Sequence, residues 1–248
     1  MTFKDHFSGH SAQYADARPN YPSALFAQIA AQAPSRRQCW DAGCGNGQAS
    51  LGWAEVFDAV FATDPSAAQI TQATAHPRIR YAVERAEACS LGDASVDLVG
   101  IAQALHWCDV DAFHREARRV LRPGGLIVEF GYGECAVDAA VDAVYRRLYD
   151  ELTAPYWPPE RRHVERRYAD LAFPFEPVDV GVMPPMQQRW TLAQYATYLD
   201  SWSASARYRA AQGHSPLDVV ADDLVRAWGD PEHTRTVTWA LFVRVGRA

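Results

Sequence analysis

Three glycines alternate with other residues in one short segment of the chain, Asp41-Ala42-Gly43-Cys44-Gly45-Asn46-Gly47. The segment follows a short apolar run typical of a strand and precedes a pattern typical of a helix. Because glycine has no Cβ, Gly43 and Gly45 let the backbone turn sharply and approach a ligand closely, and the helix behind them adds free N–H groups. The segment therefore predicts a ligand-binding turn, with a plain strand-to-helix connection as the alternative.

The spacing of the glycines and of one acid narrows the class of ligand. A dinucleotide fingerprint requires a third glycine five residues after Gly43, and that position holds Gln48. Asp64 lies 21 residues after Gly43, at the end of the second predicted strand. A carboxylate there can accept hydrogen bonds from both hydroxyls of a ribose. The alternative role is to cap the next helix, although Ser66 is available for that.

Composition excludes several kinds of chemistry. The chain has 248 residues with 24 basic and 30 acidic side chains, and its net charge of −6 argues against general binding to a phosphate backbone. Lys4 is the single lysine, so almost no candidate exists for a Schiff-base or P-loop lysine. The five cysteines form no C-x-x-C pair, which indicates a reducing compartment and neither a disulfide framework nor a zinc finger.

The N-terminus lacks the apolar stretch of a signal peptide, and no run of 18 apolar residues occurs. We therefore expect a cytoplasmic protein without a membrane partner. A cluster of possible ligands, from His106 to His114, lacks the spacing of a metal site on one helix face. We expect no metal, with Asp109 capping the following helix.

Apolar runs alternate with helical patterns over the first half of the chain, as in a parallel sheet covered by helices on both faces. The predicted strands cover 38–41, 58–63, 79–83, 95–102 and 126–130. The predicted helices cover about 23–32, 48–56, 66–75, 86–90 and 110–121.

The second half of the chain differs in composition and is rich in proline, arginine and aromatic residues. Residues 136–152 are predicted to be helical, and 191–229 to form two helices broken around 213–216. Residues 236–245 alternate as an antiparallel strand would, with 178–182 as its predicted partner. The segment 191–229 would then be an insertion that covers the mouth of the site.

The ordered motifs of residues 38–131 resemble those of class I S-adenosylmethionine-dependent methyltransferases. They are the glycine segment, Asp64, Ala86-Glu87, Asp97-Leu98-Val99 and Leu121-Arg122-Pro123-Gly124-Gly125. A looser resemblance, to the small-molecule branch that includes trans-aconitate methyltransferase-like proteins, assigns no substrate. It rests on Tyr14, Arg18-Pro19, Tyr21-Pro22, Ala104-Leu105-His106-Trp107, Trp190-Thr191-Leu192 and Ser201-Trp202-Ser203.

The resemblance implies an α/β, Rossmann-like, seven-stranded doubly wound sheet with an antiparallel C-terminal hairpin and a helical cap. The expected single domain comprises an N-terminal lid and helix over 1–34, a cofactor-binding core over 35–135, and a C-terminal part over 136–248 with the cap at about 191–229. The implied activity is methyl transfer from S-adenosylmethionine to a small molecule, with S-adenosylhomocysteine as product.

The resemblance also implies roles at the cofactor. Gly43 and Gly45 would contact its methionine part, with Asp41 near the ammonium group directly or through water. Asp64 would hold the ribose, and Pro65 would pack on the adenine. Ala86 and Glu87 would lie at the adenine edge, and Gln103 at the methionine part or the mouth of methyl transfer. The complete expected set is Tyr14, Arg18, Asp41, Gly43, Cys44, Gly45, Asp64, Pro65, Ala86, Glu87 and Gln103. For Glu87, a solvated loop acid is the alternative.

The residues after the fourth strand limit the chemical classes of methyl acceptor. Enzymes that methylate amino groups of DNA or of protein glutamine often carry an Asn/Asp-Pro-Pro-Tyr type sequence there, whereas this chain has Gln103-Ala104-Leu105-His106-Trp107. We therefore expect no nucleic-acid partner and favour an oxygen or carboxylate acceptor. His106 is the candidate catalytic base because its ordinary pKa lies near neutrality, with a structural or orienting role as the alternative.

Aromatic side chains are expected to line a pocket for a flat or apolar acceptor. The candidates are Tyr21, Trp107, Tyr132 and Trp202. Arg18 could bind a carboxylate or lie on the surface. The clustered arginines alternate with acids and are predicted to be solvated; they are Arg161, Arg162, Arg166 and Arg167.

Two other functions stay open at this point, and the oligomeric state is not predicted. A nicotinamide-dependent oxidoreductase has a similar strand, glycine turn and acid, although Gln48 speaks against it. A catalytically inactive cofactor-binding regulator would keep the same cofactor residues. The N-terminal lid is expected to close over bound cofactor.

Overall fold

Five parallel strands form one half of a mixed, eight-stranded sheet in the computed structural model, which describes residues 18–248. The sheet order is β3-β2-β1-β4-β5-β8-β6, and β7 also pairs with β8. The parallel strands are β1 (Gln38–Ala42), β2 (Ala59–Asp64), β3 (Ile79–Val83), β4 (Val96–Ala102) and β5 (Leu121–Ala136). The antiparallel part consists of β6 (Glu176–Pro177), β7 (Met186–Trp190) and β8 (Arg235–Arg247).

The sheet order reverses between β1 and β4, which are parallel neighbours at its centre. Nearly every residue of both strands is buried, as is typical of parallel strands at the centre of a sheet. In sheets of this kind ligands bind beyond the carboxyl ends of the strands at the point of reversal. The turn that starts at Gly43 and the loop that starts at Gln103 follow these two strands. The topology therefore places the site where the sequence motifs lie.

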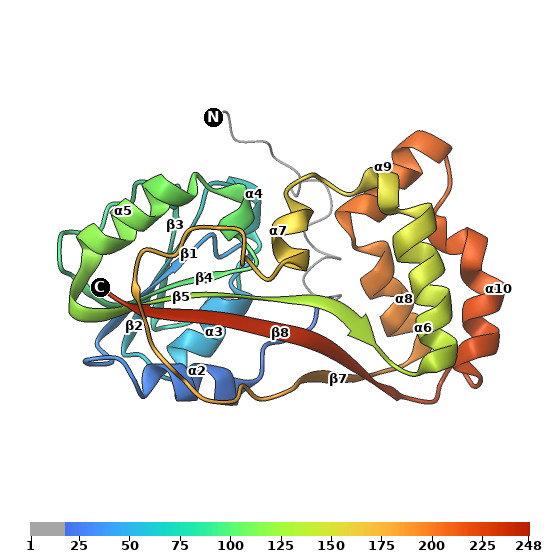
Figure 1. Ribbon diagram of the computed structural model, residues 1–248, viewed down its shortest axis with the longest axis horizontal. Helices are drawn as coiled ribbons and strands as arrows, with labels where there is room; N and C mark the ends of the chain where they lie inside the picture. Colours follow the sequence, from blue (N-terminus) through green and yellow to red (C-terminus); the bar gives the residue numbers. More distant parts are fainter. Residues whose placement is uncertain (1–17) are drawn as a thin grey trace.

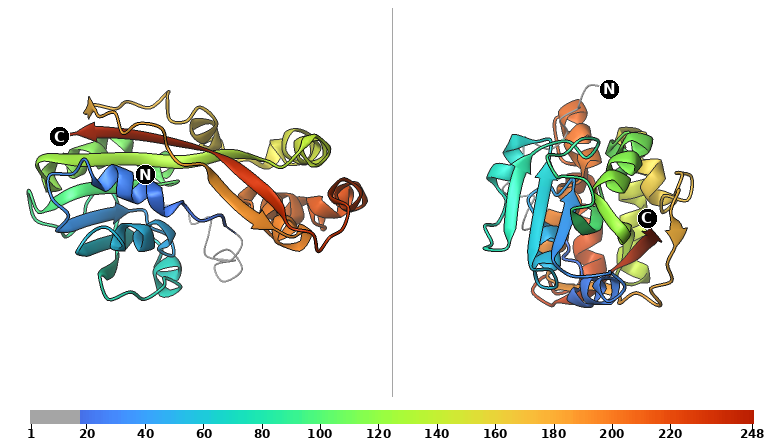
Figure 2. Two further views of the ribbon diagram at one scale, coloured as in Figure 1. Left: turned by 90° about the horizontal axis from the view of Figure 1, so that it is seen from below. Right: turned by 90° about the vertical axis from the view of Figure 1, so that its left-hand side faces the viewer.

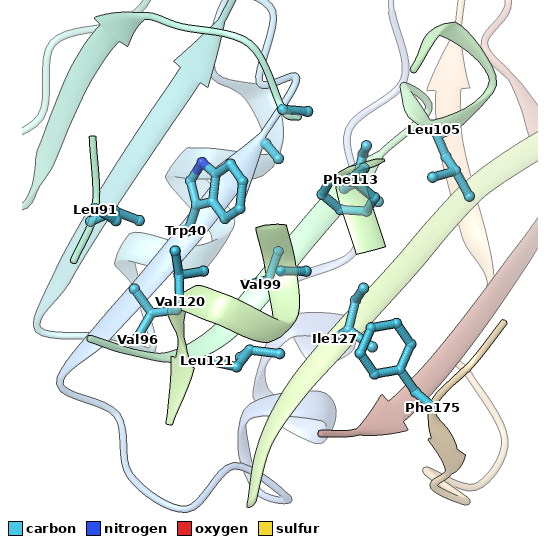
Figure 3. Close-up of a cluster of buried hydrophobic side chains, with 14 of the residues drawn as sticks. Trp40, Leu91, Val96, Val99, Leu105, Phe113, Val120, Leu121, Ile127 and Phe175 are labelled. Carbon is cyan, nitrogen blue, oxygen red and sulfur yellow. The ribbon is translucent and has the colours of Figure 1, made fainter. Parts of the chain in front are cut away.

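Helices cover both faces of the parallel strands (Figure 1). On one face α5 (Val110–Val120) packs on a buried cluster that includes Trp40, Val99, Phe113 and Ile127 (Figure 3). On the other face lie α2 (Ser23–Ala30) and α3 (Gln48–Ala54), whose buried side chains include Phe26 and Trp53. The short α4 (Ala67–Thr71) begins at Ser66, whose hydroxyl accepts from Gln69 N, and Asp109 caps α5 in the same way.

The remaining helices form a separate group at the far end of β5 and β8, which extend beyond the parallel core as a long ribbon (Figures 1 and 2). This helical cap consists of α6 (Ala139–Arg146), a π-helical turn (Arg147–Leu152), a 3-10 turn (Ala154–Tyr156), α8 (Leu192–Asp200), α9 (Ser203–Gln212) and α10 (Pro216–Trp228). The short α7 (Arg161–Glu165) follows the 3-10 turn, and another 3-10 turn (Leu105–Trp107) follows β4. The cap has its own aromatic core, with Tyr195, Trp202, Trp228 and Trp239 buried.

The fold class predicted from the sequence is confirmed, with local differences. The sheet has one strand more than the predicted seven, because β6 and β7 both pair with β8. Residues 178–182 are not the predicted strand, since Asp179 accepts from Gly181 N and Gly181 has a φ of +73°, which turns the chain away from the sheet. The predicted helix at 86–90 is a turn closed by a bridge between Arg85 and Ala88.

The segment 191–229 contains three helices instead of two. The predicted break at Gly213 is present, and a second break occurs at Ser201, whose hydroxyl donates to Tyr198 O, before Trp202 takes an extended conformation. Of the expected N-terminal lid and helix over 1–34, residues 1–17 with Tyr14 lie outside the described residues. Within residues 18–248, no helix has the length and apolar character needed to cross a bilayer.

Candidate cofactor and acceptor site

The glycine turn after β1 has the geometry that its sequence predicts. Gly43, Gly45 and Gly47 have φ values of +65°, +55° and +91°, in the left-handed region that favours glycine. A Cβ built on Gly43 would lie 2.7 Å from the Cβ of Ala104, in the loop after β4. The turn is thus packed against a neighbouring loop, and at Gly43 and Gly45 it presents backbone to the ligand space.

Asp64 fixes the glycine turn to the end of β2. Its Oδ2 accepts from Gly45 N at 2.9 Å, and its Oδ1 accepts from Ser66 N at 2.8 Å. Since each carboxylate oxygen has two lone pairs, Asp64 can still accept further hydrogen bonds from a ligand. The alternative role considered for Asp64 was to cap the next helix. Ser66 is the residue that caps α4.

Asp41 lies behind the turn and is fully buried. Its Oδ2 accepts from Ser50 Oγ at 2.5 Å, and its Oδ1 has no hydrogen-bond partner within residues 18–248. Burial raises the pKa of Asp41 to about 7. Asp41 does not line the ligand cavity, and its expected place near the ammonium group of the cofactor, directly or through water, stays a prediction.

A single cavity of about 840 Å³ runs from the glycine turn to the helical cap. The structure brings to its wall every predicted site residue within 18–248 except Asp41. These residues are Arg18, Tyr21, Gly43, Cys44, Gly45, Asp64, Pro65, Ala86, Glu87, Gln103, His106, Trp107, Tyr132 and Trp202. Tyr14 lies outside the part of the chain that is described.

Glu87 is tethered at the cavity wall. Its Oε1 accepts from Asp109 N at 2.9 Å, and its Oε2 lies 3.2 Å from Arg85 Nε. Burial opposes ionisation, but the hydrogen bonds from Arg85 and from backbone N–H groups prevail and lower the pKa of Glu87. These contacts argue against the alternative of a free, solvated loop acid.

Gln103 has an unusual backbone conformation, with a φ of +54° directly after β4. Its Nε2 donates to Tyr132 O at 2.8 Å, while its Oε1 is buried and has no partner among the described residues. Left-handed non-glycine residues are strained and cluster at ligand sites. The strain and the unsatisfied acceptor are both consistent with a ligand contact at Gln103.

His106 lies on the cavity wall in the 3-10 turn after β4. Its Nδ1 shares a hydrogen bond of 2.9 Å with the hydroxyl of the buried Tyr168. Burial, followed by the positive charges of Arg161 and His163, lowers the pKa of His106 to about 3. His106 is therefore a neutral side chain and a weak base. The prediction of a catalytic base relied on the ordinary pKa of histidine, which burial lowers here.

This pKa predicts a pH-dependent stability. The unfolded state takes up a proton on His106 near pH 6.5 and the folded state does so only near pH 3, so stability falls as pH falls through this window. Between pH 7 and pH 5 the loss from His106 is on the order of 2 kcal/mol. Asp41, with its raised pKa, contributes in the opposite direction over this range.

Urea unfolding at the two pH values isolates the histidine when the wild type is compared with His106→Asn. Between pH 7 and pH 5 the free energy of unfolding should fall less in His106→Asn than in the wild type. The control variant, in which Asn replaces the exposed His233, should behave as the wild type does. Identical pH dependence in the wild type and His106→Asn would show that His106 titrates normally.

Several lining residues were not predicted. Tyr145, Trp157 and Tyr198 come from the cap segments and surround Trp202, with ring centroids 5.4–5.8 Å from its own. The abundance of aromatic residues beyond 150 was a signal, but which of them face the cavity depends on how the cap packs. Arg161, predicted to be solvated, also lines the cavity.

Comparisons with known proteins agree with this geometry. A family model described as a methyltransferase domain matches residues 40–128. A solved structure described as a proposed type II methyltransferase from Anaeromyxobacter dehalogenans is 48% identical, covers 93% of this chain and 97% of that one, and has a TM-score of 0.86. A protein of Dictyostelium discoideum named as a proposed methyltransferase is 29% identical over 230 residues, which are 91% of this chain and 87% of that protein.

A malonyl-[acyl-carrier protein] O-methyltransferase of Enterobacter lignolyticus is 35% identical over 123 residues, 48% of this chain and 47% of that enzyme. The chain belongs to the class I S-adenosylmethionine-dependent methyltransferases. It is thus a methyltransferase, and its family uses S-adenosylmethionine as methyl donor. This membership excludes the nicotinamide-dependent alternative, while the resemblance to the trans-aconitate branch stays a prediction.

The role of Asp64 can be tested with the product of the donor. Asp64→Ala should weaken S-adenosylhomocysteine binding by roughly 10- to 100-fold, the effect of losing hydrogen bonds to a charged group. Calorimetric titration measures this, with Asp58→Ala as control because Asp58 is exposed at the opposite end of β2. An affinity of Asp64→Ala equal to that of the control would remove Asp64 from the site.

Proposed function

We propose that this methyltransferase transfers the methyl group to an oxygen of a small-molecule acceptor, with a carboxylate or another readily ionised oxygen as the nucleophile. The observation that carries the proposal is the single cavity that joins the glycine turn to an aromatic cap. Such a cavity has room for the donor and an acceptor together. We infer that Tyr21, Trp107, Tyr132 and Trp202 contact the acceptor, under a cap formed by 191–229.

The residues present fit the donor. Gly43 and Gly45 offer a cradle without side chains, Asp64 has lone pairs for ribose hydroxyls, and Gln103 has an unsatisfied buried oxygen beside the cavity. Pro65, Ala86 and Glu87 would flank the adenine. S-adenosylmethionine supplies a methyl group already activated by a sulfonium. A lone pair of the acceptor oxygen forms the new O–C bond as the C–S bond breaks and its electron pair goes to sulfur.

The protein's part in such a displacement is alignment and exclusion of water. A general base is needed only where the acceptor oxygen still carries its proton. With a pKa of about 3, His106 is poorly suited to removing a proton from a neutral alcohol. We infer that His106 orients the acceptor through a hydrogen bond. This supports an acceptor that is ionised before it binds, and the O-methyltransferase name of the Enterobacter relative is in line with it.

Turnover with S-adenosylmethionine labelled in its methyl group tests the proposal. The enzyme is incubated with separate pools of small carboxylic acids, phenols and amines, and labelled products are treated with mild alkali. Methyl esters release volatile methanol under these conditions, whereas methyl ethers and methylamines do not. We expect alkali-labile label from the acid pool. Label confined to the amine pool would contradict oxygen methylation, and bound donor without any turnover would favour the inactive-regulator alternative.

A further inference from the structure

Arg161 lies at the start of α7, and its side chain lines the cavity at the end covered by the cap. Its guanidinium lies 5.0 Å from the ring centroid of Trp157 and 5.8 Å from that of Tyr149. Arg162, the next residue, is exposed and does not line the cavity. Arg161 therefore faces inward, although the alternation of charges in this segment predicted a solvated cluster.

A short hydrogen-bond chain fixes the orientation of Arg161. Its Nε donates to Tyr149 Oη at 3.1 Å, and Tyr149 Oη in turn donates to Glu165 Oε1 at 2.8 Å. Within residues 18–248 Tyr149 is the hydrogen-bond partner of Arg161, and no carboxylate forms an ion pair with it. The Nε side of the guanidinium is thus held by protein, which leaves the two Nη groups for a ligand.

The charges along the cavity are divided between its two ends. The cofactor end has three acids and one arginine, namely Asp64, Glu87, Asp109 and Arg85. The cap end has two arginines and one acid, namely Arg18, Arg161 and Glu160. S-adenosylmethionine carries a net positive charge at neutral pH, so the acidic end suits it. The basic end is complementary to an anionic acceptor.

The chemistry of the cap end is more specific than its charge. A guanidinium presents parallel N–H donors that match the two oxygens of a carboxylate. Beside Arg161 stand the aromatic rings of Trp157, Tyr145 and Trp202, which offer apolar faces to a flat molecule. Arg161 also lies close enough to His106 for its charge to lower the pKa of that side chain.

We propose that Arg161 binds the acceptor of this enzyme together with the aromatic residues of the cavity, and that the acceptor is a carboxylic acid with a flat, apolar body. Its carboxylate is bound by the Nη groups of Arg161, and its body lies among the aromatic rings of the cap. Tyr149 and Glu165 are positioning residues that act through Arg161. The inference rests on the proposed function, since it assigns the acceptor for the same cavity.

The test compares two probes that differ in charge and little in shape, trans-cinnamate and trans-cinnamamide. Calorimetric titrations use the protein saturated with S-adenosylhomocysteine, in the wild type, Arg161→Gln, Arg161→Lys and the matched control Arg162→Gln. We expect the wild type and Arg162→Gln to bind the acid roughly 10-fold or more tightly than the amide. Arg161→Gln should lose this preference, and Arg161→Lys should keep part of it.

S-adenosylhomocysteine binding by the same proteins distinguishes a failure of the Arg161 assignment from a failure of the proposed function. Retained binding in Arg161→Gln shows that this variant is folded and that the cofactor end is intact. If the wild type binds no S-adenosylhomocysteine, the proposed function itself fails. If all four proteins bind it but Arg161→Gln still prefers the acid, or the wild type does not prefer it at millimolar concentrations, the assignment of Arg161 is overturned while the proposed function stands.

Discussion

Replacement of Gly43 by valine should lower the affinity for S-adenosylhomocysteine by at least about 100-fold while the protein stays folded. Gly43 has a φ of +65°, a conformation that β-branched residues strongly disfavour. A Cβ at this position would also lie 2.7 Å from the Cβ of Ala104, so the turn or the loop after β4 must move. Either movement displaces backbone that faces the cavity. Calorimetric titration gives the affinity, and circular dichroism confirms the fold.

Gly124 offers a matched control for backbone strain alone. It also has a left-handed φ, +76°, but a Cβ there would have no heavy atom within 4 Å, and it does not line the cavity. Gly124→Val should therefore lower stability and leave S-adenosylhomocysteine binding unchanged. Equal affinities of the two valine variants would mean that the glycine turn does not contact the cofactor.

Arg244→Met should lower the free energy of unfolding by about 3–5 kcal/mol, the usual result of removing one partner of a buried ion pair. Glu129 on β5 is fully buried, and it accepts from Arg244 Nε at 2.9 Å and lies 2.6 Å from His114 Nε2. The guanidinium of Arg244 also donates to the carbonyl oxygens of Tyr168 and Leu171. The variant leaves a buried carboxylate without its cation and two carbonyls without a donor.

Urea unfolding measures the effect, and an exposed pair provides the comparison. Arg147 and Asp223 are 44% and 40% exposed, so Arg147→Met should cost no more than about 1 kcal/mol. In the double variant Glu129→Gln with Arg244→Met, the loss should be smaller than the sum of the two single losses, because the unpaired charge is gone. A loss for Arg244→Met as small as that for Arg147→Met would contradict the stabilising role assigned to the buried pair.

Local sequence patterns were sufficient for the parallel core. β1 to β4 begin and end within two residues of their predictions, because turn residues flank each of them and the residues of β1, β2 and β4 are mostly buried. Patterns failed where a few contacts decide the conformation. At 86–90 the ion pair of Arg85 with Glu87 accompanies a turn, and at 178–182 the hydrogen bond from Gly181 N to Asp179 turns the chain.

The end of the cavity at the glycine turn is built from residues that are local in sequence, and so its lining could be predicted. The glycine turn, Asp64 and Gln103 follow three neighbouring strands of one sheet. The acceptor end is assembled from segments far apart in the chain, which β5, β7 and β8 bring together (Figure 2). Neither the inward orientation of Arg161 nor the low pKa of His106 is visible before that assembly, because both depend on which side chains surround them.

Titration of the wild-type protein with S-adenosylhomocysteine, with NADH in a parallel experiment, shows which kind of nucleotide the cavity binds. The titration requires no knowledge of the acceptor, and it measures binding at the glycine turn and Asp64. We expect S-adenosylhomocysteine to bind in the micromolar range and NADH not to bind. Binding of NADH without binding of S-adenosylhomocysteine would contradict this expectation, because the turn would then hold a dinucleotide.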